Sequence, residues 1–127
     1  MRSMISHGSD VDVVTLLRDA GVPFAFLHGS RAAGTSRAGS DLDVAAWLGA
    51  DVDELELRSR LPEHVDLLVL DNAPLELAGR VAMHGEVILD ADRPARVAWQ
   101  ATMRKIFADE RYRIERARRD FADTHRG

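Results

Sequence analysis

Hydrophobic positions along the chain change their spacing several times, and each change marks a predicted element. Helical spacing of apolar residues predicts three short helices, over residues 11–20, 53–60 and 75–83. Short apolar runs predict four strands, over residues 23–27, 41–48, 65–70 and 86–89. Between Pro94 and Gly127 there is no further glycine or proline, which predicts one long helix or two short ones. The alternation of strands and helices predicts a sheet with helices packed on it.

The size of the chain fits a single compact domain. It has 127 residues, of which 46% are hydrophobic, and two full domains would not fit in that length. We expect residues 1–92 to form the core and residues 93–127 to be a helical extension of the same domain. An apolar stripe in this extension is expected to pack on the core, and any uncovered part would be a surface for self-association or a partner. The stripe consists of Met103, Phe107, Ile114 and Phe121.

Charge and cysteine content exclude some classes of function. Residues 1–92 carry 16 acidic and 7 basic residues, whereas residues 93–127 carry 5 acidic and 10 basic residues. The overall charge of −4 argues against direct nucleic-acid binding. The absence of cysteine excludes disulfides, thiolate zinc sites and thiol nucleophiles. Because there is no signal sequence and no apolar run of about 20 residues, we expect a cytoplasmic protein that does not bind membranes.

Two aspartates open the second predicted strand. Asp41 and Asp43 flank Leu42, and side chains two positions apart along a strand point to the same face. Carboxylates that close repel each other unless a cation lies between them, and hard oxygen ligands suit Mg²⁺ or Mn²⁺. The alternative is that the pair only caps the strand end in water. The pair alone does not decide between these readings.

Asp66 is a charge within an otherwise apolar run of valine and leucine. An ionised carboxylate in a strand buried on both faces is costly unless it is paired or bound to metal. If strand 65–70 lies beside strand 41–48, Asp66 converges with Asp41 and Asp43. Three carboxylates in one place would suit two metal ions and an in-line phosphoryl or nucleotidyl transfer. The alternative is an edge-strand aspartate that faces solvent.

Gly29 and Ser30 follow the first predicted strand at a turn. Glycine lets the backbone approach an anion closely, and the Ser30 hydroxyl and amide are donors for phosphate. A Gly-Ser pair alone most often marks only a turn. Here one loop separates it from Asp41 and Asp43, so all four residues can share one site. The neighbouring His28 is expected to be structural, with ligand contact as the alternative.

The stretch from Gly29 to Asp43 reads Gly-Ser-Arg-Ala-Ala-Gly-Thr-Ser-Arg-Ala-Gly-Ser-Asp-Leu-Asp. It resembles the signature of the DNA polymerase beta-like nucleotidyltransferase superfamily. The short chain is similar to the minimal nucleotidyltransferases, the MNT antitoxins often paired with HEPN ribonuclease toxins. The resemblance covers residues 10 to about 90, with Asp66 as the third carboxylate. It implies an α/β (α+β) fold, a small mixed sheet packed with helices, followed by a C-terminal helical tail.

The resemblance also implies the roles of the site residues. The nucleotide-binding residues would be Gly29, Ser30, Arg31 and Arg37, and the catalytic, metal-binding residues Asp41, Asp43 and Asp66. The cofactor would be Mg²⁺, with two ions bound, and ATP would be the co-substrate. The reaction would transfer AMP to a hydroxyl, that of a tyrosine in the HEPN toxin, and so neutralise the toxin.

Two other functions remain open. A binding antitoxin would block its toxin by contact alone, and the basic, amphipathic C-terminal stretch favours this reading. A small-molecule nucleotidyltransferase, such as an antibiotic-inactivating enzyme, would need a homo-oligomer whose second copy supplies the acceptor pocket. Nucleic-acid polymerisation is disfavoured because the chain has no room for a template-binding domain.

Overall fold

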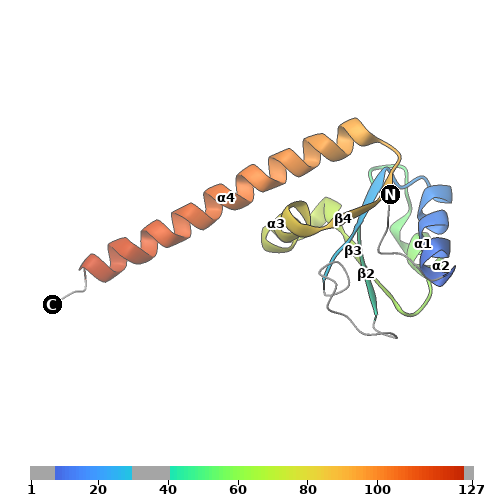
Figure 1. Ribbon diagram of the computed structural model, residues 1–127, viewed down its shortest axis with the longest axis horizontal. Coiled ribbons are helices and arrows are strands. Elements are labelled where there is room, and N and C mark those ends of the chain that lie inside the picture. Colours follow the sequence, from blue (N-terminus) through green and yellow to red (C-terminus); the bar gives the residue numbers. More distant parts are fainter. Residues whose placement is uncertain (1–7, 30–40, 125–127) are drawn as a thin grey trace.

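The computed structural model describes residues 8–29 and 41–124. The elements in chain order are α1 (Gly8–Asp19), β1 (Phe24–Leu27), β2 (Leu42–Trp47), α2 (Glu54–Arg60), β3 (Val65–Val69), a 3₁₀ turn η1 (Leu70–Asn72), α3 (Leu75–His84), β4 (Glu86–Asp90) and α4 (Arg93–Thr124). Figure 1 shows a small sheet with helices on both sides and one long helix that leaves it. The predicted α/β (α+β) class is confirmed, and each predicted strand and helix is present within a few residues of its expected bounds.

The sheet is mixed and has the strand order β3-β2-β1-β4. β1 runs antiparallel to both β2 and β4. β2 and β3 run parallel, since α2 carries the chain back between them. β3 is therefore an edge strand and a direct neighbour of β2.

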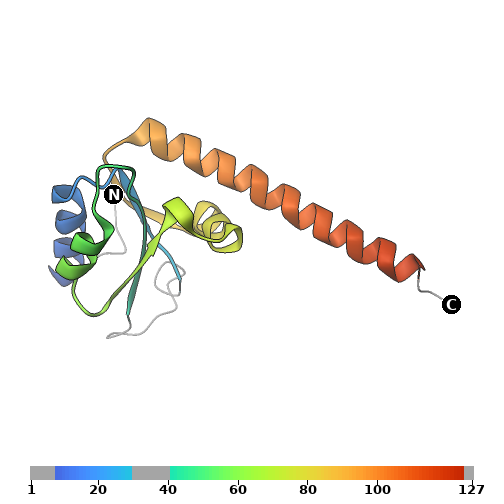
Figure 2. The same cartoon turned by 180° about the vertical axis from the view of Figure 1, so that it is seen from behind.

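Each face of the sheet has its own hydrophobic cluster, because side chains alternate along the strands. On one face, strand residues such as Leu42 and Val44 pack against Leu17 of α1 and Leu57 of α2. On the other face, Phe24 and Phe26 of β1 pack against residues of the last two helices, notably Val81 of α3 and Trp99 of α4. The two views in Figures 1 and 2 show α1 and α2 on one side and α3 on the other.

Local sequence explains most element ends. Gly21 adopts φ +89° directly after α1, as expected of a glycine that stops a helix. The Asp53 side chain accepts a hydrogen bond from the Glu56 backbone N–H (3.1 Å) and so caps α2. After β3, the Asp71 carboxylate accepts hydrogen bonds from the backbone N–H groups of Leu48 and Gly49, both at 2.8 Å. This last contact ties the end of β2 to the 3₁₀ turn, which the sequence pattern did not reveal.

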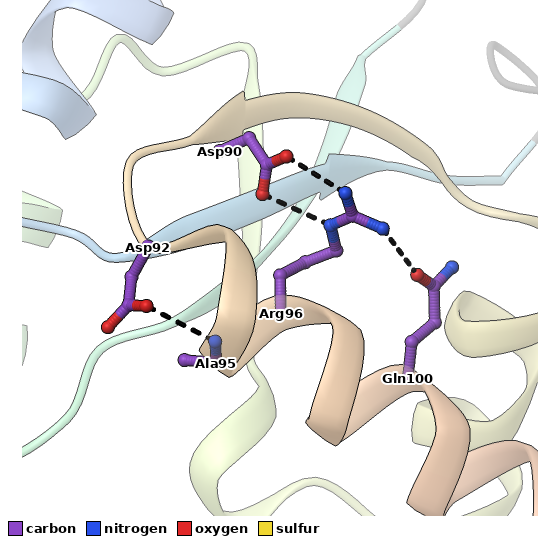
Figure 3. Close-up of polar contacts among 5 residues, drawn as sticks. All are labelled: Asp90, Asp92, Ala95, Arg96 and Gln100. Atoms are coloured by element: carbon purple, nitrogen blue, oxygen red, sulfur yellow. Dashed lines mark hydrogen bonds and ion pairs between the residues drawn. The ribbon is translucent and has the colours of Figure 1, made fainter.

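The junction between β4 and α4 is fixed by charged side chains (Figure 3). The Arg96 guanidinium donates two hydrogen bonds to the Asp90 carboxylate, at 3.0 and 2.9 Å, and a third to Gln100 Oε1 at 3.1 Å. The Asp92 side chain accepts a hydrogen bond from the backbone N–H of Ala95 at 3.2 Å. These contacts set the direction in which α4 leaves the sheet.

α4 is one helix of 32 residues, which selects one of the two predicted alternatives. Its first half packs on α3: Arg104 Nε and Gln100 Nε2 both donate to the Ala82 carbonyl oxygen, at 2.7 and 3.1 Å. Its second half extends away from the domain in both views. The expectation that the whole apolar stripe packs on the core is therefore wrong beyond Phe107, since Ile114 is 44% exposed.

Candidate functional site

Three polar residues form a row across neighbouring strands on one face of the sheet. Asp43 of β2 is the register partner of Asp66 on the parallel strand β3. On the other side, the His28 backbone N–H donates to the Asp43 carbonyl oxygen at 3.0 Å, so His28 continues the antiparallel pairing of β1 with β2. Residues opposite one another in a sheet point to the same face. His28, Asp43 and Asp66 therefore lie on the face of Phe26 and Ala45, which α3 and α4 cover farther along the strands.

Asp41 lies next to this row. It directly precedes β2 and is exposed, Asp43 is half-buried, and Leu42 between them is fully buried in the core of the opposite face. The burial of Leu42 in the cluster of the opposite face fixes the alternation, so both carboxylates belong to the face of Phe26 and Ala45. The predicted juxtaposition of Asp41 and Asp43 thus has a packing cause in this fold.

Asp66 is placed beside Asp43, but its environment differs from the one its sequence suggests. The apolar run around it suggests a strand buried on both faces, whereas β3 is at the sheet edge and Asp66 is exposed. Only Leu67 and Val69, on the other face, are buried. Burial of the Asp66 carboxylate is therefore not a reason for it to need a cation. Its position beside Asp43 is the feature that remains.

Gly29 is held against Asp43 by the turn that follows β1. It adopts φ +76°, a conformation that residues with a side chain rarely take. A Cβ at this position would overlap the Asp43 carboxylate, because it would meet Oδ2 and lie 3.2 Å from Cγ. Glycine at this position thus lets the Asp43 carboxylate lie against the backbone of the turn, a close approach to an anion that a side chain would prevent.

His28 is the residue of this row that the sequence predicts to be structural, with ligand contact as the alternative. Burial lowers the pKa of its imidazole, while the nearby charges of Asp43 and Asp66 act to raise the pKa. Its Nε2 atom is buried and has no hydrogen-bond partner among the residues that the structure describes. The signal that could have revealed its position is the antiparallel register of β1 and β2, which cannot be read from either strand alone.

Three of the predicted nucleotide-binding residues cannot be placed relative to this row. Ser30, Arg31 and Arg37 lie outside the described residues. Within residues 8–29 and 41–124, no three His, Cys, Asp or Glu side chains are gathered closely enough to hold a metal ion together, so ligation by all three aspartates stays a prediction. The three aspartates nevertheless fit Mg²⁺, because Asp41, Asp43 and Asp66 offer carboxylate oxygens on one face of the sheet.

A known protein family matches the part of the chain that contains these residues. The family described as Polymerase beta, Nucleotidyltransferase matches residues 13–94, which include β1, β2 and β3 with Gly29 and all three aspartates. The chain therefore belongs to the polymerase beta-type nucleotidyltransferases. No curated protein matches the chain significantly.

Solved structures share the fold at low sequence identity. A toxin-antitoxin with AMP-PNP contains a chain that is 21% identical (TM-score 0.69; 91% of this chain and 98% of that chain covered). The toxin-antitoxin MntA-HepT contains one that is 19% identical (TM-score 0.63; 89% and 96% covered). A complex of the tri-AMPylated HEPN toxin of Shewanella oneidensis with MNT antitoxin contains one that is 21% identical (TM-score 0.54; 86% and 95% covered). Each of these matches covers at least 86% of this chain, whereas residues 1–92 are less than three quarters of it. The matches therefore extend beyond residue 92 into α4.

The described helices include none that is both long and apolar enough to cross a membrane.

Proposed function

We propose that this protein is an antitoxin that transfers AMP from ATP to a hydroxyl, that of a tyrosine, of a HEPN-type ribonuclease toxin and thereby neutralises it. The observation that carries the proposal is the placement of Asp43 beside Asp66, with Asp41 adjacent and Gly29 packed against Asp43. Solved structures with a similar fold, one with AMP-PNP and one with an AMPylated HEPN toxin, support the same reaction. Family membership supports nucleotidyl transfer in general.

The reaction is an in-line displacement at the α-phosphorus of ATP. The acceptor oxygen forms a bond to this phosphorus while the bond to the bridging oxygen of the β-phosphate breaks, and pyrophosphate leaves. Asp66 accepts the proton of the attacking hydroxyl, a role for which its exposed position at the sheet edge leaves access. Asp41, Asp43 and Asp66 would hold Mg²⁺, which when bound neutralises phosphate charge and stabilises the charge that develops during transfer.

The backbone of the turn binds the nucleotide. Gly29 brings the backbone of the turn close to Asp43, so a phosphate bound by the turn would lie beside the carboxylates that would hold Mg²⁺. The Ser30 hydroxyl and the guanidinium groups of Arg31 and Arg37 are the proposed donors to the triphosphate. These donors are carried over from the resemblance of their motif.

The proposal is tested by co-expression with the product of the neighbouring gene, the candidate toxin. We expect the intact mass of that protein to rise by one or more AMP units with the wild type, and not at all with Asp41→Asn/Asp43→Asn. Asn keeps the size of the side chain and removes the charge, so the double variant should still fold and bind. An unmodified toxin with both proteins would contradict AMP transfer.

A binding antitoxin is the second candidate, and one observation favours it: the second half of α4 exposes large apolar residues, among them Ile114 and Tyr112. In that case the toxin is neutralised equally by the wild type and by the double Asn variant. Turnover of an aminoglycoside by the protein alone would instead indicate a small-molecule nucleotidyltransferase.

A further inference from the structure

The second half of α4 is a long helical surface that the domain does not cover. At about 1.5 Å per residue, the 32 residues of α4 span about 48 Å. The helix packs on α3 as far as Phe107, whose ring lies against Gly79. From residue 111 to residue 123 every side chain is exposed. A helical segment of this length is marginal in water by itself, so packing against another molecule would stabilise it.

A groove opens where α4 diverges from the start of α3. Its apolar part is formed by Leu75 of α3 and by Phe107 and Ile114 of α4, and arginines and glutamates surround it. Positions 107, 111, 114 and 118 follow the spacing of three and four that places residues on one side of a helix. The groove therefore combines an apolar stripe with charges at its margin, which is the arrangement that receives an amphipathic helix.

The charges that line the groove are three glutamates and three arginines. Glu76 is paired with Arg80 at 2.9 Å and Glu110 with Arg113, outside the groove, at 3.1 Å, which leaves Arg111 and Arg118 against Glu115, an excess of one positive charge. Arg111 lies over the Phe107 ring at 5.9 Å from its centroid. Among the described residues, neither Arg111 nor Arg118 has a carboxylate within ion-pair distance. Carboxylates from a partner would fit here.

The groove also lies on the catalytic side of the sheet. α3 and α4 pack over Phe24 and Phe26 of β1, and His28, two residues farther on, begins the row that contains Asp43 and Asp66. In Figures 1 and 2, α3 and α4 are both on the side of the sheet opposite α1 and α2. A protein held by this groove would thus lie on the face from which an acceptor hydroxyl reaches the aspartates.

We propose that the groove formed by Leu75, Phe107, Arg111, Ile114 and Arg118 is the docking surface for the acceptor protein, through a helix with an apolar ridge flanked by carboxylates. This inference rests on the proposed function and names the contact that delivers its substrate. A second copy of the chain fits less well. Its own α4 would bring the exposed residues 111–123, where five arginines outnumber three acidic residues, against Arg111 and Arg118.

The test compares substitutions on the two sides of α4. Ile114→Glu places a charge in the groove, and Arg111→Glu/Arg118→Glu reverses the charge at its margin. Tyr112→Glu is the matched control, because Tyr112 is equally accessible, at 57% exposure, and lies on the far side of the helix from Ile114. All three variants change exposed positions of one helix, so folding should be retained and is checked by circular dichroism.

The measurement is the initial rate of AMP transfer to the candidate toxin encoded by the neighbouring gene as a function of its concentration, together with the Kd of the complex. We expect both groove variants to raise KM and Kd at least tenfold with unchanged kcat, and Tyr112→Glu to stay within twofold of the wild type. Equal KM for Ile114→Glu and Tyr112→Glu would overturn the inference.

Two further outcomes separate this inference from the proposed function and from self-association. If the wild type modifies nothing but Ile114→Glu still loses the complex, docking stands and AMP transfer fails. If light scattering shows that Ile114→Glu turns a dimer into a monomer while KM stays unchanged, the groove holds a second copy and the inference is overturned.

Discussion

Phe107 of α4 lies so close to Gly79 of α3 that a side chain at position 79 has no room: an added Cβ would overlap the ring and lie 2.8 Å from Phe107 Cβ. The contact holds α4 against α3 at the point where α4 leaves the domain. Glycine is otherwise unfavourable inside a helix, by about 1 kcal/mol relative to alanine. Its presence in α3 is explained by the approach of Phe107.

We therefore expect Gly79→Ala to lower the free energy of unfolding by about 1–2 kcal/mol, because overpacking outweighs the gain in helix propensity. Urea denaturation measures the change. In the background of Phe107→Ala the ring is gone, and Gly79→Ala should then be neutral or stabilising. A loss of the same size in both backgrounds would refute the proposed contact.

A second glycine links backbone geometry to activity. Gly29→Ala combines a positive φ with overlap of the Asp43 carboxylate, so we expect the rate of AMP transfer to fall more than tenfold. Gly49→Ala is the matched control: its φ is +78°, but its Cβ would meet only Trp47 Nε1 at 3.9 Å. Both variants should lose about 1–2 kcal/mol from backbone strain, and only Gly29→Ala should lose activity. An equal loss of activity in both would show that strain alone is responsible.

Divalent metal should stabilise the folded protein through the aspartates. Adding Mg²⁺ is expected to raise the Tm of the wild type, because a ligand that binds only the folded state stabilises it and carboxylates without a cation repel one another. The same addition should leave the Tm of Asp41→Asn/Asp43→Asn unchanged. Differential scanning calorimetry with and without EDTA makes the comparison, and an identical shift in both proteins would place the Mg²⁺ elsewhere.

The Asp71 carboxylate offers a test of the link between β2 and the 3₁₀ turn. Asp71→Ala removes the acceptor of the Leu48 and Gly49 backbone N–H groups and should cost about 1–2 kcal/mol of unfolding free energy. Asp71→Asn keeps one side-chain oxygen and should lose less. Chemical denaturation of both variants measures the two losses. Equal losses would mean that the oxygen retained in Asn contributes no stability through its hydrogen bond.

The junction of β4 and α4 predicts a dependence of stability on pH. Hydrogen bonds from Arg96 hold the pKa of Asp90 below its ordinary value, so the folded state favours the charged carboxylate. The ion pair of Asp90 with Arg96 therefore adds to the free energy of unfolding above about pH 4, and this stabilisation is lost as the pH falls through the lowered pKa of Asp90. At pH 7, Asp90→Asn should therefore lower the unfolding free energy by about 1 kcal/mol, and the difference from the wild type should shrink in acid.

Asp109→Asn is the control for this pair. Asp109 pairs with Lys105 at 3.3 Å, but both side chains are more than two thirds exposed, whereas Arg96 and Asp90 are 17% and 30% exposed. We expect no measurable effect of Asp109→Asn at either pH. A loss as large as that of Asp90→Asn would assign the effect to net charge rather than to the junction.

The local features of this protein follow from its sequence alone. Apolar spacing predicts the strands and helices, and Gly21 ends α1 as expected. The motif from Gly29 to Asp43 identifies the family, because the turn and the alternating aspartates involve residues close together in the chain. Short-range spacing is sufficient for such features, since a helix or strand presents its side chains at fixed periods.

Only the tertiary structure decides which distant residues meet. Asp66 could equally have faced solvent far from the other aspartates; the parallel pairing of β3 with β2 places it beside Asp43. The row gains His28 for the same reason, through the antiparallel register of β1. The extension of α4 beyond Phe107 depends on the junction at Arg96 and on the length of α3. Strand order and helix direction are set by packing between segments far apart in the chain, and no local period encodes them.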